Sequence, residues 1–135
     1  MSIGDLWGES PPPEIPKPVE ILMEQASFLE KKTENQLMGN VLSTARPRGS
    51  ELFNYLLEIV VPALDDYSFG VLRISFELMP IYPLDVEDMV HDKEYTCNDE
   101  DHLIDVLKRI LSSDEVRKVI QRLLWQIGLE KRTGI

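Results

Sequence analysis

The chain has 135 residues, of which 43% are hydrophobic, a length and composition that suit one domain with a single core. Its 24 acidic and 14 basic residues give a net charge of −10, which repels nucleic-acid phosphates and anionic lipid headgroups, so we expect neither nucleic acid nor a membrane as a partner. The sequence has no apolar run near the roughly 20 residues of a spanning helix, no signal-peptide pattern and a lone cysteine, Cys97, which together predict a cytoplasmic protein.

The first 17 residues predict a proline-rich, flexible arm ahead of a single domain at residues 18–135. Five of the nine prolines fall within the first 18 positions, a composition that favours polyproline II structure or disorder. Leu6 and Trp7 offer the alternative that the arm is pinned to the domain, and Pro13 and Pro16 have the spacing of a ligand for an aromatic groove. We interpret the segment as a linker and expect it to contribute little to stability.

The domain begins with a pattern of helical period, followed by patterns of period two. Apolar residues at three- and four-residue steps predict a helix from Val19 to about Ser43: Leu22, Ala26, Leu29, Leu37, Val41 and Leu42. Residues 53–61 and 71–78 alternate in polarity, and a turn beginning at Pro62 separates them, so we expect an antiparallel hairpin. The hairpin register is open because the connection is longer than a two-residue turn.

The rest of the chain predicts an acidic loop and two helices. The segment 85–101 holds eight acidic residues and one lysine, and we expect a loop with at most a short strand. One helix should begin near Asp99, and another should follow the capping sequence at residues 112–115 and end at Gly128. The predicted fold class is therefore α+β, an antiparallel meander sheet packed by one N-terminal and two C-terminal helices.

A short motif after the second strand adds a resemblance to a known superfold. The strand ends in Leu78-Met79-Pro80 and is followed by Tyr82-Pro83. This pair and the order of the elements resemble the ubiquitin-conjugating-enzyme-like superfold, including its non-catalytic RWD branch. The resemblance implies a rigid crossing of the sheet edge at this pair, and a role in binding other proteins. The chain departs from the family after the pair, where residues 84–87 contain no further proline.

Cys97 is the candidate for catalysis, because conjugating enzymes carry a nucleophilic cysteine downstream of this motif. The resemblance also implies a His-Pro-Asn tripeptide in active members, and no such tripeptide precedes Cys97. The acidic neighbours Asp99 and Glu100 should raise the pKa of the thiol and reduce its thiolate fraction. We therefore expect no catalytic residue and interpret Cys97 as structural, with a divergent conjugating enzyme that uses Cys97 as the alternative.

The residue patterns give little support for a bound metal or cofactor. His91, Cys97 and His102 are separated by six and five residues, which matches no compact zinc site. The acidic segment lacks the alternating acidic positions and central glycine of an EF-hand loop. We expect no metal and no cofactor.

Basic residues gather in the last 28 positions, which contain Lys108, Arg109, Arg117, Lys118, Arg122, Lys131 and Arg132. These are half of the 14 basic residues of the chain. Such a distribution is typical of the solvated faces of amphipathic helices. The alternative is a docking surface for an acidic partner.

These features predict a non-catalytic protein-interaction module that binds another protein. A homodimer is a further option. If alternate residues of the first strand face the helices, Leu56 and Val60 point to the other side of the sheet, where Val71 would join them. We expect these three residues to form a partner-binding patch bordered by charge. A small acidic secretion chaperone, which dimerises around a substrate segment and has a helix among its strands, is the alternative within the binding class.

Overall fold

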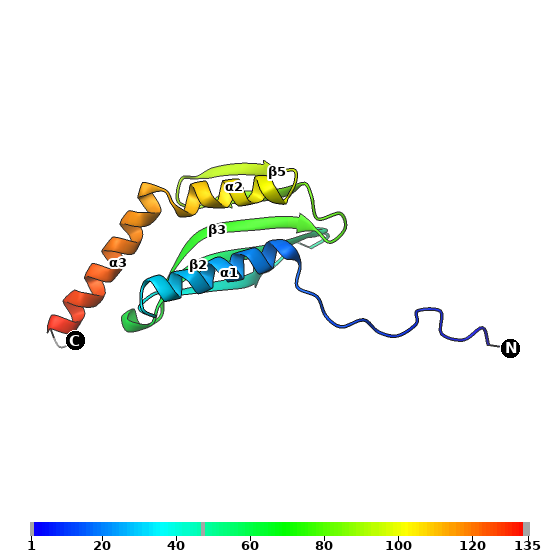
Figure 1. The fold of residues 1–135 in the computed structure, drawn as a ribbon, viewed down its shortest axis with the longest axis horizontal. Helices are drawn as coiled ribbons and strands as arrows, with labels where there is room; N and C mark the ends of the chain where they lie inside the picture. The colour runs from blue at the N-terminus through cyan, green and yellow to red at the C-terminus, as the bar shows by residue number, and fades with distance from the viewer. Residues whose placement is uncertain (1, 47, 134–135) are drawn as a thin grey trace.

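The computed structural model describes residues 2–46 and 48–133, which form one five-stranded antiparallel sheet and three α-helices (Figure 1). The elements in chain order are α1 (Lys17–Lys32), β1 (Met38–Thr44), β2 (Leu52–Val61), the 3-10 helix η1 (Pro62–Leu64), β3 (Tyr67–Glu77), β4 (Leu84–Asp88), β5 (Lys93–Cys97), α2 (Glu100–Leu111) and α3 (Asp114–Thr133). The strands lie side by side in the order in which they occur in the chain. This meander confirms the predicted α+β fold class.

The N-terminal helix is shorter than its apolar pattern predicts. α1 ends at Lys32, and the next residue joins the helix to the strand: the Thr33 hydroxyl donates to the Leu29 carbonyl oxygen (2.9 Å) and accepts from the Leu37 amide (3.1 Å). The two residues that follow Thr33 have positive φ angles of 52° and 64° and turn the chain. The prediction of a helix to Ser43 was wrong, because residues 38–44 pair with β2 as an edge strand.

The acidic segment contains two strands where we expected a loop. It follows a connection in which the Met79–Pro80 and Tyr82–Pro83 peptide bonds are both cis. In β4 the buried side chains are Leu84, Val86 and Asp88, and the acidic residues between them lie on the outer side. The alternation was hard to recognise because one of its three buried positions is an aspartate. β5 pairs with β4 and completes the sheet.

The predicted starts of the two C-terminal helices are confirmed, and the predicted end is wrong. Asp99 caps α2, since its side chain accepts the amide of His102 at 2.8 Å. At the start of α3 the Ser113 hydroxyl accepts the amide of Val116 at 3.3 Å. α3 continues through Gly128, whose φ is not positive, to Thr133. None of the helices in the described part of the chain is long and apolar enough to cross a membrane.

Gly39 lets α1 lie directly against β1. A Cβ atom at position 39 would be 2.5 Å from both the Cα and the Cβ atom of Ala26 on α1, closer than real contacts allow. A glycine facing a small alanine is therefore what this approach of helix and strand requires. The fully buried Leu22 on the same helix then reaches the core of the sheet. As a result α1 is seated over the edge of the sheet.

A β-bulge in β3 sets the register of the central hairpin. Leu57 pairs with Leu72, but the next residue, Glu58, pairs with Gly70, so Val71 is an extra residue in β3. A bulge places two residues opposite one and interrupts the alternation of side chains. Val71 and Leu72 are consequently both buried, with 2% and 0% of their surface exposed.

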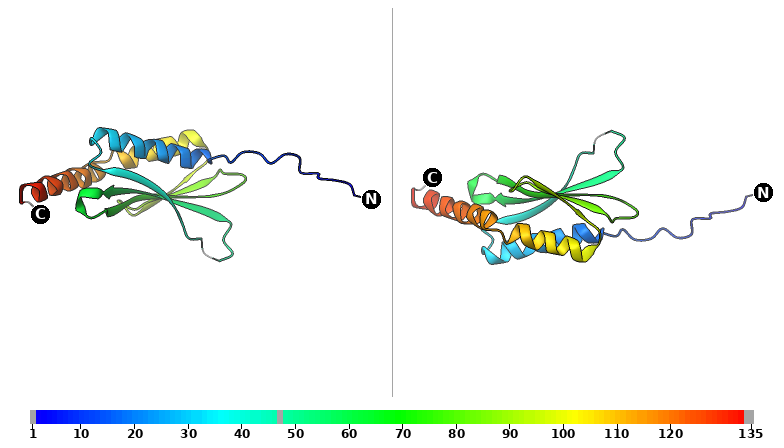
Figure 2. Two further views of the ribbon diagram at one scale, coloured as in Figure 1. Left: turned by 90° about the horizontal axis from the view of Figure 1, so that it is seen from below. Right: turned by 90° about the horizontal axis from the view of Figure 1, so that it is seen from above.

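The proline-rich arm leads away from the domain in all the ribbon views (Figure 1, Figure 2). α1 begins directly after Pro16, whose φ and ψ of −55° and 136° lie in the polyproline II region. Leu6 is 81% exposed and Trp7 is 96% exposed. These two residues therefore do not pin the arm to the domain in this structure.

We predict that Gly39→Ala lowers the free energy of unfolding by about 1–3 kcal/mol, because the new methyl group meets the backbone of α1. Gly128→Ala is the matched control: a Cβ there meets nothing within 4 Å, and alanine should stabilise the α3 interior by up to about 1 kcal/mol. Urea unfolding followed by far-ultraviolet circular dichroism measures both. Equal stability of wild type and Gly39→Ala would contradict the close seating of α1.

Candidate functional site

A groove lies between α1 and α2, which occupy the same face of the sheet (Figure 2). α1 packs on β1 and α2 packs on β5, the two edge strands. Four strand spacings of about 4.8 Å separate these edges by about 19 Å, whereas two helices in direct contact have axes about 8–10 Å apart. Space of about the width of one helix therefore remains over the middle of the sheet.

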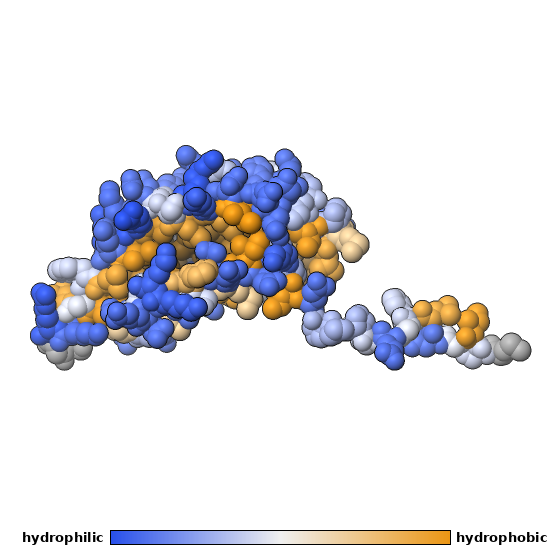
Figure 3. All heavy atoms as spheres, viewed as in Figure 1, coloured by the Kyte–Doolittle hydropathy of each residue, from blue (hydrophilic) through white to orange (hydrophobic). Residues whose placement is uncertain are grey.

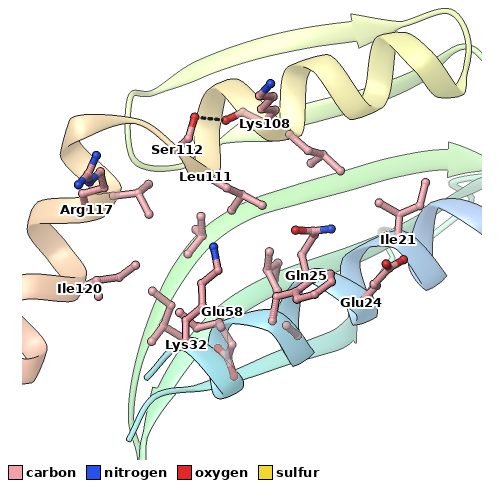
Figure 4. Close-up of a pocket in the computed structure, with 18 of the residues that line it drawn as sticks. Ile21, Glu24, Gln25, Lys32, Glu58, Lys108, Leu111, Ser112, Arg117 and Ile120 are labelled. Carbon is pink, nitrogen blue, oxygen red and sulfur yellow. Dashed lines mark hydrogen bonds between the residues drawn. The ribbon is translucent and has the colours of Figure 1, made fainter. Parts of the chain in front are cut away.

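The groove has a volume of about 950 Å³ and is lined mainly by apolar side chains (Figure 4). Its floor consists of Leu57 and Ile59 on β2 and Val71 on β3. Phe28 on α1 and Ile104 on α2 stand in the two walls, and each is 44% exposed. The start of α3 closes one end. Figure 3 shows a band of hydrophobic atoms between the hydrophilic outer surfaces of the helices.

Basic side chains outnumber acidic ones around the groove, although the protein as a whole is acidic. The cations come from all three helices: Lys17, Lys32, Lys108 and Arg117. None of these four takes part in an ion pair within the described residues. The acidic lining residues are Glu24, Glu58 and Glu100, and the Glu58 carboxylate accepts a hydrogen bond from Asn40 at 3.1 Å. The groove thus combines an apolar interior with charged groups of both signs, four cations and three carboxylates.

The opposite face of the sheet carries Leu56 and Val60 but not Val71. Leu56 and Val60 are half-buried, and Leu56 lies close to Gly70 and to Met89. Val71 belongs to the floor of the groove, and the prediction that it shares a patch with Leu56 was wrong. The reason is the bulge, which turns Val71 to the helix side.

Polar pairs between strands cover much of this opposite face. The Ser75 hydroxyl donates to the Asn54 side chain at 2.6 Å, and the Thr96 hydroxyl donates to Asp85 at 3.0 Å. Arg73, opposite Leu56 in the sheet, donates to Glu87 through Nε at 3.0 Å. Polar side chains that are hydrogen-bonded to one another are typical of a sheet face that is exposed to water. The groove is therefore the stronger candidate site.

His91 connects the β4–β5 turn to α3 through two carboxylates. Its Nδ1 lies 2.6 Å from Asp88 Oδ2, and its Nε2 lies 3.0 Å from Glu115 Oε2. Asp88 is only 1% exposed and also accepts the backbone amides of Val90 and His91, each at 3.0 Å. Hydrogen bonds to Glu115 and Asp88 raise the pKa of His91, and the bond to His91 lowers the pKa of Glu115. The cluster fixes the start of α3, which forms the end of the groove.

Cys97 is fully buried and has an unreactive environment. Burial, followed by the nearby charges of Asp85 and Asp99, raises the pKa of the thiol. Burial also raises the pKa of Tyr82, with smaller effects of Glu100, Cys97 and Asp99, and its hydroxyl has no hydrogen-bond partner among the described residues. A protonated, inaccessible thiol is poorly suited to nucleophilic attack.

The three residues considered for zinc are not brought together as a metal site. Both ring nitrogens of His91 face carboxylates, Cys97 is buried, and His102 lies on the exposed first turn of α2. Residues 2–46 and 48–133 contain no group of three or more His, Cys, Asp or Glu side chains arranged to hold a metal ion.

No sequence pattern indicates the groove or the His91 cluster directly. Both depend on side chains from elements that are far apart in the chain. A weak indication of the groove was the presence of large apolar residues, Phe28 and Ile104, outside the strip of each helix that packs on the sheet. His91 and Glu115 are 24 positions apart, so no local pattern connects them.

We predict that His91→Gln destabilises the protein more at pH 5.5 than at pH 8.5. The pKa of His91 is higher in the folded protein than its value of about 6.5 in the unfolded chain. Protonated His91 therefore stabilises the fold fully at pH values below about 6.5, and this stabilisation is lost as the pH rises through the pKa of the folded protein. Because the pKa of Glu115 is lowered in the folded protein, its carboxylate stabilises the fold at pH values above about 4.5, the pKa of the unfolded chain. Urea unfolding at both pH values measures the difference, and Glu115→Gln should reduce it. Equal losses at the two pH values would contradict the cluster.

We also predict that native Cys97 resists alkylation at neutral pH, because the thiol is buried and its pKa is raised. Iodoacetamide should modify it readily in urea and only at the rate of unfolding in buffer. Mass spectrometry of timed samples gives both rates. Rapid modification of the folded protein at pH 7 would support the conjugating-enzyme alternative.

The groove therefore combines an apolar interior with four cations and three carboxylates. Such a surface is suited to contact with apolar groups. The His91 cluster is a structural connection, and the Cys97 environment opposes thiol chemistry. Compared with protein-family models, with curated proteins and with solved structures, the chain has no match.

Proposed function

We propose that this protein is a non-catalytic protein-interaction module that binds a short segment of another protein in the groove between α1 and α2. The observation that carries the proposal is an open groove of about 950 Å³ with an apolar floor and with Phe28 and Ile104 partly exposed in its walls. Apolar grooves flanked by helices bind peptide segments through a few large side chains.

The chemistry of the groove defines the segment. Apolar side chains of the segment would displace water from Phe28 and Ile104, which supplies affinity. Acidic residues beside them would meet the four cations, which steers association and selects against basic segments. The ligand class is therefore a peptide segment with large apolar residues and acidic neighbours.

Other observations support an interaction module over the alternatives. The order of the elements and the Tyr82-Pro83 pair are consistent with the resemblance to the non-catalytic RWD branch. In the described part of the chain no α-helix interrupts the strands, as the secretion-chaperone alternative would require. The buried Cys97 gives no support to the conjugating-enzyme alternative.

We predict that Phe28→Glu weakens the binding of peptides selected from a displayed library of short random sequences by about tenfold or more, the loss expected for a buried apolar anchor. Ile104→Glu, in the opposite wall, should have a similar effect. Met23→Glu is the matched control, because Met23 is on α1, is 47% exposed and does not line the groove. Fluorescence anisotropy of labelled peptides gives the dissociation constants.

Leu56→Asp in the same assay examines the opposite face of the sheet. We expect it to bind the selected peptides like wild type and to keep its circular dichroism spectrum. Loss of binding with Leu56→Asp and normal binding with Phe28→Glu would move the site to that face. Failure to select any peptide that distinguishes Phe28→Glu from Met23→Glu would refute the proposed function.

A further inference from the structure

The arm itself carries a segment of the class that the groove should bind. Ile3, Leu6 and Trp7 are 86%, 81% and 96% exposed, three large apolar side chains within five residues. A group of this kind in water is unfavourable and marks a site of contact. Figure 3 shows hydrophobic atoms near the far end of the arm, apart from the domain.

The charge of the arm complements the cations of the groove. Residues 2–16 contain the acidic Asp5, Glu9 and Glu14 and no lysine or arginine. The groove is lined by four cations that form no ion pair within the described residues and by three carboxylates, so it has a small excess of positive charge. Opposite charge favours the arm as a ligand even though two whole molecules, each of charge −10, repel one another.

With residues 11–16 extended, the arm is too short to bring Leu6 and Trp7 back to the groove of its own domain, whereas Ile3, seven residues before Ser10, could return by about 25 Å. Residues 11–16 contain four prolines and extend outward by about 19 Å, at about 3.1 Å per residue in polyproline II. If the chain reversed at Ser10, Leu6 would return by at most about 14 Å, because four extended residues span about 3.5 Å each. Leu6 and Trp7 would then remain outside the domain. The length of the arm does not limit binding to the groove of a second molecule, because that molecule can approach the end of the arm.

We propose that the end of the arm, with Ile3, Leu6 and Trp7, occupies the groove of a second copy of this chain, so that two copies exchange arms. The inference rests on the proposed function, since it requires a groove that accepts apolar, acidic segments. It adds that the chain carries its own ligand. Self-association and the binding of another protein then compete for the same groove.

Complementation between two full-length variants tests the exchange. The arm variant carries Leu6→Ser and Trp7→Ser and keeps an intact groove, whereas the groove variant carries Ile104→Glu and keeps an intact arm. Sedimentation velocity across a concentration series should show dimers of wild type and dimerisation weakened by about tenfold or more in each variant alone. An equimolar mixture of the two variants should associate more strongly than either, because it restores one intact arm with one intact groove.

Matched controls separate this effect from changes in folding or charge. Ile15→Ser alters an arm residue that is 50% exposed beside the domain, and Met23→Glu adds a charge to α1 outside the groove. Both should dimerise like wild type. Phe28→Glu replaces Ile104→Glu if the latter loses the circular dichroism spectrum of the folded protein. A labelled peptide of residues 2–10 should bind the arm variant and should bind the groove variant about tenfold more weakly or worse.

Three results would overturn the exchange of arms: a monomeric wild type at every concentration, dimers that persist in the arm variant, or a mixture of variants no more associated than its components. The arm variant also separates this inference from the proposed function. If selected library peptides still bind its groove, the proposed function stands while the exchange of arms fails. If neither library peptides nor the 2–10 peptide bind, both fail.

Discussion

The contact between Gly39 on β1 and Ala26 on α1 determines how the helices are distributed over the sheet. Because a Cβ atom at position 39 would lie 2.5 Å from Ala26, this approach requires glycine. It seats α1 over the β1 edge, while α2 packs over the β5 edge. α1 also contacts β2, and the axes of the two helices are too far apart for direct packing. The groove is a consequence of this arrangement, because it lies between the helices above the buried Leu57, Ile59 and Val71.

The bulge at Val71 gives the two faces of the sheet different characters. It turns both Val71 and Leu72 toward the helices and so adds one apolar side chain to the floor of the groove. The opposite face keeps Leu56 and Val60, but around them polar side chains pair across the strands, as in Ser75 with Asn54. The helix face thus has a floor of buried apolar side chains beneath the groove, and the opposite face combines half-buried apolar residues with hydrogen-bonded polar pairs. This difference is the reason for the proposal that recognition takes place in the groove.

The acidic excess of the chain has several separate roles. Asp99 caps α2, and the buried Asp88 together with Glu115 holds His91 and the start of α3. Other carboxylates, such as Asp85, lie on the outer side of β4. The lining of the groove departs from this excess, because its four cations from all three helices outnumber its three carboxylates. A net charge of −10 therefore does not describe the local field that a ligand would meet.

The sequence by itself determined the α+β fold class, because the periods of helices and strands are local patterns, and the starts of α2 and α3, because capping residues act within a few positions of the chain. It also predicted that Asp99 raises the pKa of Cys97, although burial has the larger effect. Only the tertiary structure decided that α1 ends at Lys32 and that Val71 faces the helices. Val41 and Leu42 fit helical spacing equally well, and pairing with β2 selected the strand. The groove could not be predicted, since periodicity describes one segment, whereas an uncovered apolar surface depends on where every segment packs.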